Sequence, residues 1–183
     1  MLEEKIDNIV RQSVTGFSDG YCSELNRDME AWLNSLSQCL HQGVMLFIDY
    51  GYSRHEYYHE QRTQGTLLCH YRHRVHSDPF LYVGLQDITA SVDFTAVAEA
   101  ALSCKLNVSG FTSQAYFLIA CGLERILQEQ KDLDAKEQLE LSRQIKMLTL
   151  PGEMGERFKV IALTRDLDMA LSGFALVDHR RRL

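Results

Sequence analysis

The chain has 183 residues, 45% of them hydrophobic, and a formal net charge of −6. This length and composition predict one domain, residues 1–183, with a hydrophobic core, and the negative charge argues against a general nucleic-acid or membrane-surface role. The basic cluster at Arg180, Arg181 and Arg182 is interpreted as a solvated tail. No apolar stretch reaches the roughly 18 residues that a membrane span needs.

The five cysteines are scattered, and none forms a C-x-x-C pair. A disulfide framework needs paired cysteines, so the thiols are expected to be reduced, as in a cytosol-like compartment. The first residues lack the positive-then-apolar layout of a signal peptide. A cytoplasmic location is therefore expected.

Two helices are predicted before residue 43. The first has apolar residues at positions 2, 6, 9 and 10 and is expected to end within 16–20. In the second, Ser23 can cap the start, and Gly43 supplies a left-handed residue at the end. The apolar residues of this second helix recur at three- and four-residue steps: Leu25, Met29, Trp32, Leu33, Leu36 and Leu40.

The run Val-Met-Leu-Phe-Ile-Asp-Tyr-Gly at 44–51 is the most informative part of the sequence. Five consecutive apolar residues favour a strand at 44–50 that is buried on both faces of a parallel sheet. Ligands of such sheets bind outside the carboxyl ends of the strands, which is where Asp49 lies. Because a buried carboxylate needs partners, Asp49 is expected either to be hydrogen-bonded within the structure or to belong to a site.

Residues 51–90 are rich in Tyr, His, Arg and Gly and show no clear period. A polar, aromatic segment of that length is more than a connection needs, so it is predicted to be a lid-like insertion. The tyrosines at positions 50, 52, 57 and 58 either line a pocket or anchor this segment to the sheet.

Helices and strands follow beyond residue 90. Helices are expected to start near 94, 112 and 134. Strands are expected at 106–111, 158–163 and 174–177. Ser91 or Asp93 can cap the helix at 94, and Asp134 with Glu137 resembles a capping box. The helices within 122–152 are predicted to form a second insertion.

The order of elements predicts an α/β fold in which the strands are few relative to the number of helices. A sheet this small leaves one edge strand with unpaired backbone groups unless another piece covers it. Self-association through this edge, giving a homo-oligomer, is one expected outcome. Strand addition by another protein is the other.

Several segments, taken together and in order, resemble one family. They are Trp32, Gly43, the strand at 46–51, Glu56-Tyr57-Tyr58, Gly65-Thr66-Leu67, Asp78-Pro79, Gly84, Gln86-Asp87-Ile88-Thr89, Val92-Asp93-Phe94, Thr112-Ser113-Gln114, Phe117-Leu118, Gly122, and Met154-Gly155 to Phe158-Lys159-Val160. The pattern is similar to that of the MidA-type class I S-adenosylmethionine-dependent methyltransferases, a family that includes an arginine methyltransferase of mitochondrial complex I assembly. The resemblance covers residues 21–165 and implies S-adenosyl-L-methionine as cofactor and a protein arginine as methyl acceptor.

The cofactor-binding half of that family has no counterpart here. The chain contains no Gly-x-Gly-x-x-Gly turn, no matching acidic ribose-binding residue and no Asn-Glu…Asp-Ala-Leu-Pro segment. The resemblance therefore implies the C-terminal strands of a partial Rossmann-like sheet with flanking helices, the substrate-side part of such an enzyme. A protein substrate or a complementing N-terminal half is the expected partner.

The resemblance also points to catalytic residues. A guanidinium is best held by carboxylates that accept its planar fork, and Asp49 and Asp87 are the candidates. Asp93 is a third carboxylate, and it could equally serve as the cap of the helix at 94. His70 is a candidate proton acceptor near the substrate.

A substrate or cofactor pocket is expected beside these groups. Its candidate residues are Tyr50, Gly51, Gly65, Thr66 and Gln114. Gly65 can also serve a turn that needs a positive φ, and Gln114 can be an ordinary polar residue in the first turn of a helix.

The stretch at 69–76 has zinc-type ligands in Cys69, His70, His73 and His76. Their spacing matches no standard zinc site, and basic and aromatic residues are interleaved with them. The stretch is interpreted as part of the polar lid, and no metal is predicted.

The leading hypothesis is thus part of a protein arginine methyltransferase that needs its cofactor-binding half. One alternative is a non-catalytic module that binds a partner through the free sheet edge or the loop surface. Another is a truncated, inactive homologue with an incomplete sheet and marginal stability.

Overall fold

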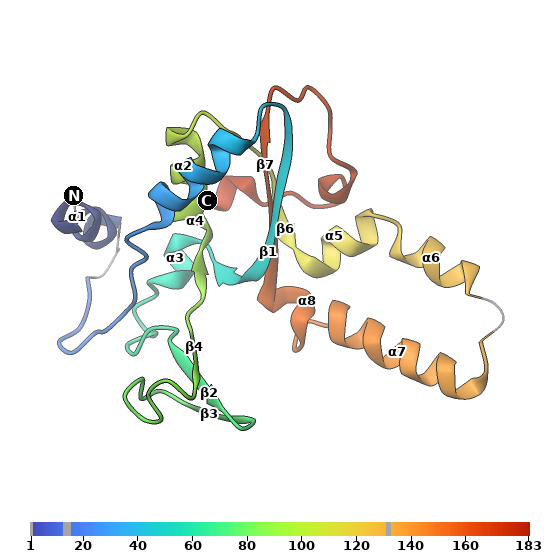
Figure 1. Ribbon diagram of the computed structural model, residues 1–183, viewed down its shortest axis with the longest axis horizontal. Coiled ribbons are helices and arrows are strands. Elements are labelled where there is room, and N and C mark those ends of the chain that lie inside the picture. The colour runs from blue at the N-terminus through green and yellow to red at the C-terminus, as the bar shows by residue number, and fades with distance from the viewer. Residues whose placement is uncertain (1, 13–15, 131–132) are drawn as a thin grey trace.

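The computed structural model describes residues 2–12, 16–130 and 133–183 (Figure 1). Its helices are α1 (Leu2–Gln12), α2 (Met29–Cys39), α3 (Arg54–Tyr57), α4 (Phe94–Ser103), α5 (Gln114–Ala120), α6 (Leu123–Glu129), α7 (Ala135–Thr149) and α8 (Met154–Arg157), with short 3-10 helices η1 (Ser172–Phe174) and η2 (Arg180–Arg182). Its strands are β1 (Gly43–Tyr52), β2 (Leu68–Tyr71), β3 (Arg74–His76), β4 (Asp87–Thr89), β5 (Val92–Asp93), β6 (Asn107–Ser113) and β7 (Phe158–Arg165). They form two sheets, ordered β5-β1-β7-β6 and β3-β2-β4.

The larger sheet is mixed. β1 pairs antiparallel with β7 over residues 43–50, and β6 pairs antiparallel with the other side of β7. β5 adds a short parallel pairing at the end of β1, at Gly51 and Tyr52. The α/β class predicted from the sequence is confirmed, although antiparallel pairs dominate the sheet instead of the expected parallel ones.

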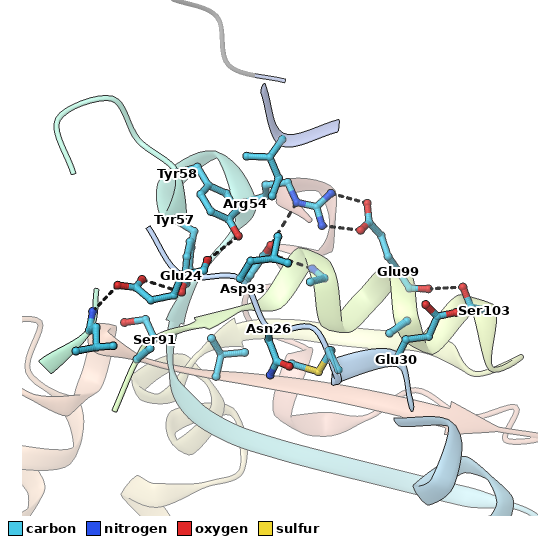
Figure 2. Close-up of a pocket in the computed structure, with 18 residues that line it drawn as sticks. Glu24, Asn26, Glu30, Arg54, Tyr57, Tyr58, Ser91, Asp93, Glu99 and Ser103 are labelled. Atoms are coloured by element: carbon cyan, nitrogen blue, oxygen red, sulfur yellow. Dashed lines mark hydrogen bonds and ion pairs between the residues drawn. The ribbon is translucent and has the colours of Figure 1, made fainter. Parts of the chain in front are cut away.

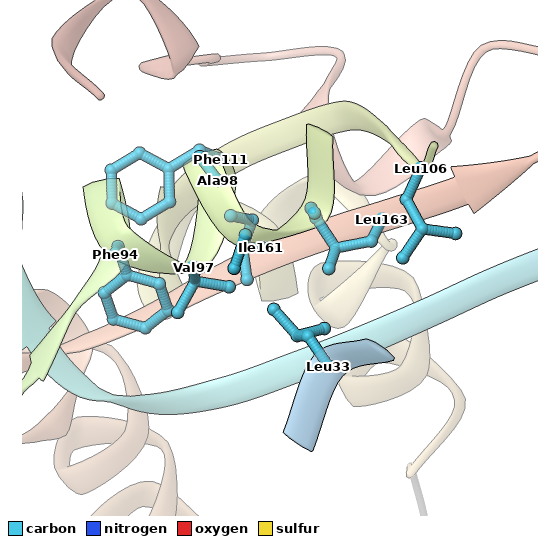
Figure 3. Close-up of a cluster of buried hydrophobic side chains, with 10 residues drawn as sticks. Leu33, Phe94, Val97, Ala98, Leu106, Phe111, Ile161 and Leu163 are labelled. Atoms are coloured by element: carbon cyan, nitrogen blue, oxygen red, sulfur yellow. The ribbon is translucent and has the colours of Figure 1, made fainter. Parts of the chain in front are cut away.

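The main core lies between α2, α4 and one face of the larger sheet (Figure 3). Its larger buried side chains come from each of these layers: Leu33, Phe94, Val97, Leu106, Phe111, Ile161 and Leu163. Each such side chain stabilises the fold by about 1.5–3 kcal/mol relative to an exposed one. Of the apolar residues predicted to share one face of α2, Met29, Leu33 and Leu40 pack into this core, whereas Trp32 is 48% exposed and Leu25 lies before α2 begins.

β7 is the strand that is buried on both faces. Ile161 and Leu163 point into the main core, whereas Val160 and Ala162 pack with Phe174 on the opposite face. The strand predicted at 158–163 is therefore confirmed, including its burial. It lies between β1 and β6, so both of its edges are paired as well.

β1 differs from the prediction in its burial. Met45 and Phe47 pack against the main core, but Val44, Leu46 and Ile48 on the other face are 40%, 43% and 47% exposed. The expectation that this strand is buried on both faces is therefore wrong for this chain. The reason is physical: α2 and α4 cover one face of β1, and its other face is left uncovered by the described residues.

Helix starts were predicted with mixed success. Asp93 caps α4 by accepting hydrogen bonds from the backbone of Thr95 and Ala96, and Asp134 with Glu137 forms the expected capping box of α7. Ser23 does not cap α2, which begins only at Met29. Residues 23–28 instead form an extended approach that places Glu24 beside the candidate site.

Two expectations near the C-terminal half also need correction. The helix expected from Thr112 begins at Gln114, because β6 continues to Ser113. The strand expected at 174–177 is absent from the described residues, and η1 occupies its start. Phe174 packs its ring against Phe117 and fills the space under α5, which holds this segment as a turn instead of a strand.

Residues 68–89 contain a small sheet that the sequence did not reveal. β2 and β3 join through Arg72 and His73, whose φ values of 47° and 64° are both positive. Such a pair is typical of a type I′ hairpin turn, which Asn-Gly usually occupies. The absence of that dipeptide explains why this segment showed no hairpin signal.

The predicted leading helix is confirmed as α1, and the residues just after it, 13–15, lie outside the described part of the chain. Within the described ranges, no helix is long and apolar enough to cross a membrane.

Candidate functional site

A cavity of about 570 Å³ lies beside the carboxyl end of β1 (Figure 2). It is bounded by Ile9 of α1, by residues 24–30 at the start of α2, by α3, and by residues 90–103, which include β5 and α4. Its charged and phenolic side chains are Glu24, Glu30, Arg54, Tyr57, Tyr58, Asp93 and Glu99. Ligands of α/β sheets commonly bind at the carboxyl ends of strands, so the cavity lies where the fold class predicts a site.

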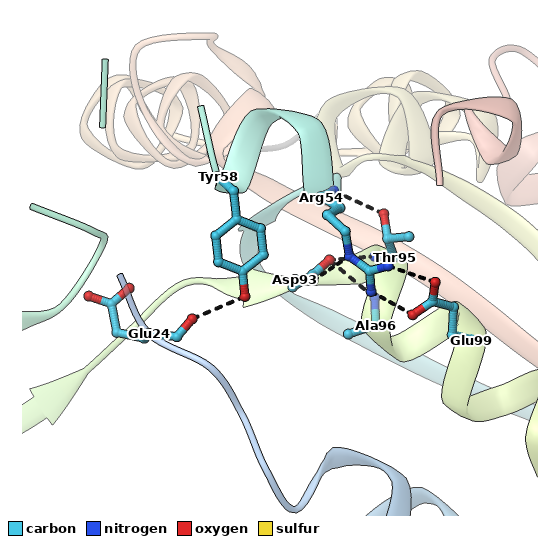
Figure 4. Close-up of polar contacts among 7 residues, drawn as sticks. All are labelled: Glu24, Arg54, Tyr58, Asp93, Thr95, Ala96 and Glu99. Carbon is cyan, nitrogen blue, oxygen red and sulfur yellow. Dashed lines mark hydrogen bonds and ion pairs between the residues drawn. The ribbon is translucent and has the colours of Figure 1, made fainter. Parts of the chain in front are cut away.

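Arg54 is the central cation of this cavity (Figure 4). Its two terminal nitrogens donate to the two carboxylate oxygens of Glu99 at 2.6 and 2.5 Å, and its Nε donates to Asp93 at 3.3 Å. Its backbone N–H also donates to Thr95 Oγ1 at 2.9 Å. The two-pronged contact with Glu99 is the strong geometry for an arginine and a carboxylate, so Arg54 locks α3 onto α4.

Asp93 makes two kinds of contact in this arrangement, one with each of its carboxylate oxygens. Its Oδ1 accepts the backbone N–H groups of Thr95 and Ala96 at 3.0 and 3.1 Å, which caps α4, while its Oδ2 faces Arg54. Burial raises the pKa of the Asp93 carboxyl, and the charge of Arg54 and the cap hydrogen bonds offset part of that rise. The capping interpretation of Asp93 is thereby confirmed, and the residue also belongs to the cavity.

Glu24 is a second polar centre, which the sequence analysis missed. Its carboxylate accepts the backbone N–H groups of Thr66 and Leu67 at 2.9–3.0 Å and the hydroxyl groups of Thr66 and Tyr57. Gly65 has a φ of +69°, and a Cβ there would lie 2.2 Å from a Glu24 oxygen. Gly65 and Thr66, both predicted pocket residues, are therefore the cradle of this carboxylate.

Tyr57 and Tyr58 form the wall next to Glu24. Their rings lie 4.8 Å apart, and the Tyr58 hydroxyl donates to the Glu24 carbonyl oxygen at 3.1 Å. Burial raises the pKa of Tyr57 to about 12 and also raises the pKa of Tyr58. Of the two interpretations of the tyrosine series, pocket lining holds for these two residues.

The raised pKa of Tyr57 predicts a loss of stability at high pH. A folded-state pKa of about 12 against 10.0 for the unfolded chain means that folding favours the neutral phenol. This contribution, about 2–3 kcal/mol, is complete below pH 10 and disappears as the pH rises towards 12. The free energy of unfolding, measured with urea across this pH interval, should therefore fall less steeply for Tyr57→Phe than for the parent chain.

The matched control is Tyr116→Phe, since Tyr116 is exposed and lies outside the cavity. That variant should follow the pH profile of the parent chain. A Tyr57→Phe profile that coincides with the parent profile would contradict the buried, neutral phenol.

A second cavity of about 650 Å³ lies between the end of β1, α3 and α8. Its wall includes Tyr52, whose ring lies 4.3 Å from the Arg62 guanidinium carbon. Lys159 also lines it, and burial lowers the pKa of this amine. Its mixture of acidic and basic groups is more balanced than that of the first cavity.

The three site residues predicted at the end of β1 lie in different surroundings in the structure. Asp49 lies outside both cavities, is exposed, and accepts a hydrogen bond from the backbone of Tyr50 at 2.8 Å. The hydroxyl of Tyr50 contacts the hydroxyl of Thr89. Gly51 is buried, and it lies directly beside Val92 of β5. A catalytic role for Asp49 stays a prediction.

His70 and Asp87 lie opposite each other on β2 and β4. Both side chains are exposed, and neither lines the first cavity. The structure thus brings these two predicted residues together but places them away from Arg54 and Glu24. Their catalytic roles also stay predictions.

Gln114 has a structural partner. Its side-chain nitrogen donates to the carbonyl oxygen of Leu148 at 2.9 Å, which ties the start of α5 to the end of α7. In the stretch at 69–76, Cys69 is buried and His73 occupies the hairpin turn. Among the described residues, no three His, Cys, Asp or Glu side chains gather in an arrangement that could hold a metal.

Of the residues singled out in the sequence, Tyr57, Tyr58 and Asp93 line the cavity, whereas Gly65 and Thr66 hold the Glu24 carboxylate without lining it. The sequence analysis missed Glu24, Arg54 and Glu99. The pairing of Arg54 with Glu99 spans 45 residues, and that of Glu24 with Thr66 spans 42. A single sequence has no local signal for such pairs. The only usable hint was the position of Arg54 immediately after a strand.

Comparison with known proteins identifies the family. Residues 1–112 match the family of S-adenosyl-L-methionine-dependent methyltransferases. The protein arginine methyltransferase NDUFAF7 homolog of Drosophila melanogaster, a mitochondrial protein, is 30% identical over 146 residues, which are 78% of this chain and 32% of that protein. The corresponding Rattus norvegicus protein is 33% identical over 123 residues, or 66% of this chain and 26% of the relative.

Two solved structures from Burkholderia thailandensis are similar in fold and sequence. A COG1565 superfamily member bound to S-adenosyl-homocysteine superposes with a TM-score of 0.90 at 44% identity, covering 97% of this chain and 46% of its own. A native structure of a COG1565 superfamily protein gives 0.90 at 43% identity, covering 98% and 48%. This chain thus spans about a third or less of the curated relatives and just under half of the solved ones. It belongs to the family of S-adenosyl-L-methionine-dependent methyltransferases.

Proposed function

We propose that this chain is the substrate-side part of an S-adenosyl-L-methionine-dependent protein arginine methyltransferase. The observation that carries the proposal is the superposition at a TM-score of 0.90 on a relative with bound S-adenosyl-homocysteine, of which this chain covers 46%. The curated relatives, which are named as protein arginine methyltransferases, support arginine as the acceptor.

The residues of this chain fit only part of a cofactor site. The turns from β1 into α3 and from β6 into α5 contain no glycine-rich loop that could cradle a nucleoside. Gly51, the glycine at the end of β1, has no free space beside it, because a Cβ there would meet the Val92 carbonyl oxygen at 2.2 Å. The cofactor loop is therefore assigned to a further part of the enzyme, on this or another polypeptide.

The first cavity suits a cationic acceptor. Among the residues that the structure describes, four carboxylates, from Glu24, Glu30, Asp93 and Glu99, and one guanidinium, from Arg54, line the cavity. This balance gives the cavity a negative potential, which favours entry of a positively charged side chain. Glu99 already holds one guanidinium, that of Arg54, in a two-pronged contact, and this supports the proposal that a substrate guanidinium is held by carboxylates in the same way.

The test is a calorimetric titration of S-adenosyl-L-methionine into two samples. The 183-residue chain alone should give no saturable binding up to about 1 mM cofactor, because a site without its glycine-rich turn and its ribose-binding carboxylate loses most of its contacts. The chain co-expressed with the unmatched part of the Burkholderia thailandensis relative should bind the cofactor and methylate an arginine peptide.

A lysine peptide of the same sequence is the matched control and should not be methylated. Saturable binding by the chain alone would contradict the missing cofactor loop. Binding by the assembled pair without transfer to the arginine peptide would contradict arginine as the acceptor.

A further inference from the structure

The second cavity, to which the proposed function gives no role, is lined by several cations. Among the residues that the structure describes, its side chains that are cationic at neutral pH are Arg62, Arg157 and Lys159. Its carboxylates, from Glu56 and Glu156, belong to exposed residues, whereas Arg62 and Lys159 are half-buried. Because an exposed carboxylate keeps its hydration, the half-buried cations lose more water here than the anions do. A carboxylate ligand would give these cations a partner.

Arg62 has a hydrogen-bond donor without an acceptor. Its guanidinium carbon lies 4.3 Å from the centre of the Tyr52 ring. The face of an aromatic ring attracts a cation without using its N–H donors, so these donors stay available. The Nε atom of Arg62 is buried, and no described residue accepts a hydrogen bond from it. Buried donors are normally paired, so the position of Arg62 favours a ligand that brings an acceptor.

Arg157 and Lys159 are available on the other side of the cavity. Within the described residues, neither forms an ion pair. Lys159 donates one hydrogen bond, from Nζ to the carbonyl oxygen of Glu156, and an ammonium has three donors. Burial lowers the pKa of Lys159 more than the nearby Glu56 and Glu156 raise it. A further negative charge in the cavity would therefore stabilise the ammonium.

The single turn of α3 separates this cavity from the first one. Arg54 and Tyr57 face the first cavity and Glu56 lines the second, because residues two positions apart on a helix point to nearly opposite sides. His55 is exposed, so a peptide can cross α3 over its surface. A helix with its side chains is about 10–12 Å wide, which an extended peptide spans in about three or four residues.

We propose that the second cavity binds the carboxylate of an Asp or Glu that lies about three or four residues from the methylated arginine of a protein substrate. This inference rests on the proposed function, which places the acceptor arginine in the first cavity. The two cavities then recognise opposite charges on one extended segment. Carboxylates hold the arginine, and Arg62, Arg157 and Lys159 hold the acidic residue. Complementary charges of this kind suppress wrong partners and fix the register of the bound segment.

The experiment measures the binding of labelled peptides to the 183-residue chain by fluorescence anisotropy at low salt. On one Gly-Ser background, an Arg–Glu peptide carries the two charges four residues apart, an Arg–Gln peptide has glutamine in place of the glutamate, and a Gln–Glu peptide has glutamine in place of the arginine. The Arg–Glu peptide should bind at least about tenfold more tightly than the Arg–Gln peptide, because it adds a partly desolvated charge pair. A peptide with adjacent Arg and Glu cannot reach both cavities and should bind like the Arg–Gln peptide.

Two variants and a labelling readout test the cavity itself. Arg157→Met should remove most of the gain from the glutamate, and this residue is exposed, so its replacement leaves the core intact. Arg143→Met is the matched control, since Arg143 lies on the surface of α7 outside the cavity and should keep the gain. Bound Arg–Glu peptide should also slow the acylation of Lys159 severalfold, as measured by mass spectrometry. Acylation of Lys136, an exposed lysine of α7, should be unchanged.

The peptide series separates this inference from the proposed function. Equal affinities for the Arg–Glu and Arg–Gln peptides, or no binding of either up to about 1 mM, would overturn the acidic-residue site. A gain from glutamate that S-adenosyl-L-methionine removes by competition would assign the cavity to the carboxylate of the cofactor and overturn it as well. A Gln–Glu peptide that binds as tightly as the Arg–Glu peptide would leave the acidic-residue site standing and count against arginine as the acceptor.

Discussion

Replacing Arg54 with methionine is expected to lower the free energy of unfolding by about 3–5 kcal/mol. Arg54 is buried, and its guanidinium joins Asp93 and Glu99. Glu99 is half exposed and can return to water, whereas the side chain of Asp93 is only 12% exposed and would keep its charge without its cation. Urea unfolding near neutral pH measures the loss.

The pH dependence of this loss gives a second check. Burial raises the pKa of Asp93, and Arg54 is the charge that opposes the rise, so the variant should have a still higher pKa at Asp93. A carboxyl with a raised folded pKa contributes stability below its unfolded pKa and loses it as the pH rises through the folded value. The loss of unfolding free energy in the variant, relative to the parent chain, should therefore be largest at neutral pH and smaller near pH 4.

Arg143→Met is the matched control for the arginine substitution. Arg143 faces Glu140 on the surface of α7 at 3.9 Å, with both side chains more than half exposed. Such a pair contributes little, so the control should stay within about 0.5 kcal/mol of the parent chain. Equal losses for the two variants would show that Arg54 acts as an ordinary surface charge.

The strands show how much of the fold a single sequence can predict. Both apolar runs, at 44–50 and 158–163, were correctly identified as strands because continuous apolar residues are a local signal. The prediction that both faces are buried was right for β7 and wrong for β1, because burial depends on which elements cover each face. The run at 44–50 has the composition of a buried strand, but the described residues cover only one of its faces.

The candidate site was predictable only where local chemistry is specific. Asp93 precedes a helix and was recognised as its possible cap, and Gly65 was recognised as a possible turn residue, which its positive φ confirms. Glu24 was hidden because Ser23 resembled a cap, which placed Glu24 inside a helix that starts only at Met29. The structure replaces that helix turn by an extended segment whose carboxylate is satisfied by backbone N–H groups 42 and 43 residues away.

Gly51→Ala is the second substitution with a large expected effect, about 3 kcal/mol or more. A Cβ at Gly51 would lie 2.2 Å from the carbonyl oxygen and 2.9 Å from the nitrogen of Val92, and 2.8 Å from the ring of Phe94. Backbone atoms cannot rotate away as a side chain can, so β5 would have to separate from β1. That movement would also displace Asp93 from Arg54, and faster amide exchange at Val92 and Asp93 would report it.

Gly152→Ala separates this close contact from the general effect of replacing a glycine. Gly152 has no left-handed φ, and no described atom lies within 4 Å of the position that an alanine Cβ would take there. The control should therefore be unchanged or up to about 1 kcal/mol more stable, because alanine restricts the unfolded chain. If Gly51→Ala unfolded at the same urea concentration as this control, β5 would be free to move, and the cavity next to it would lack the rigid wall that an acceptor-binding site requires.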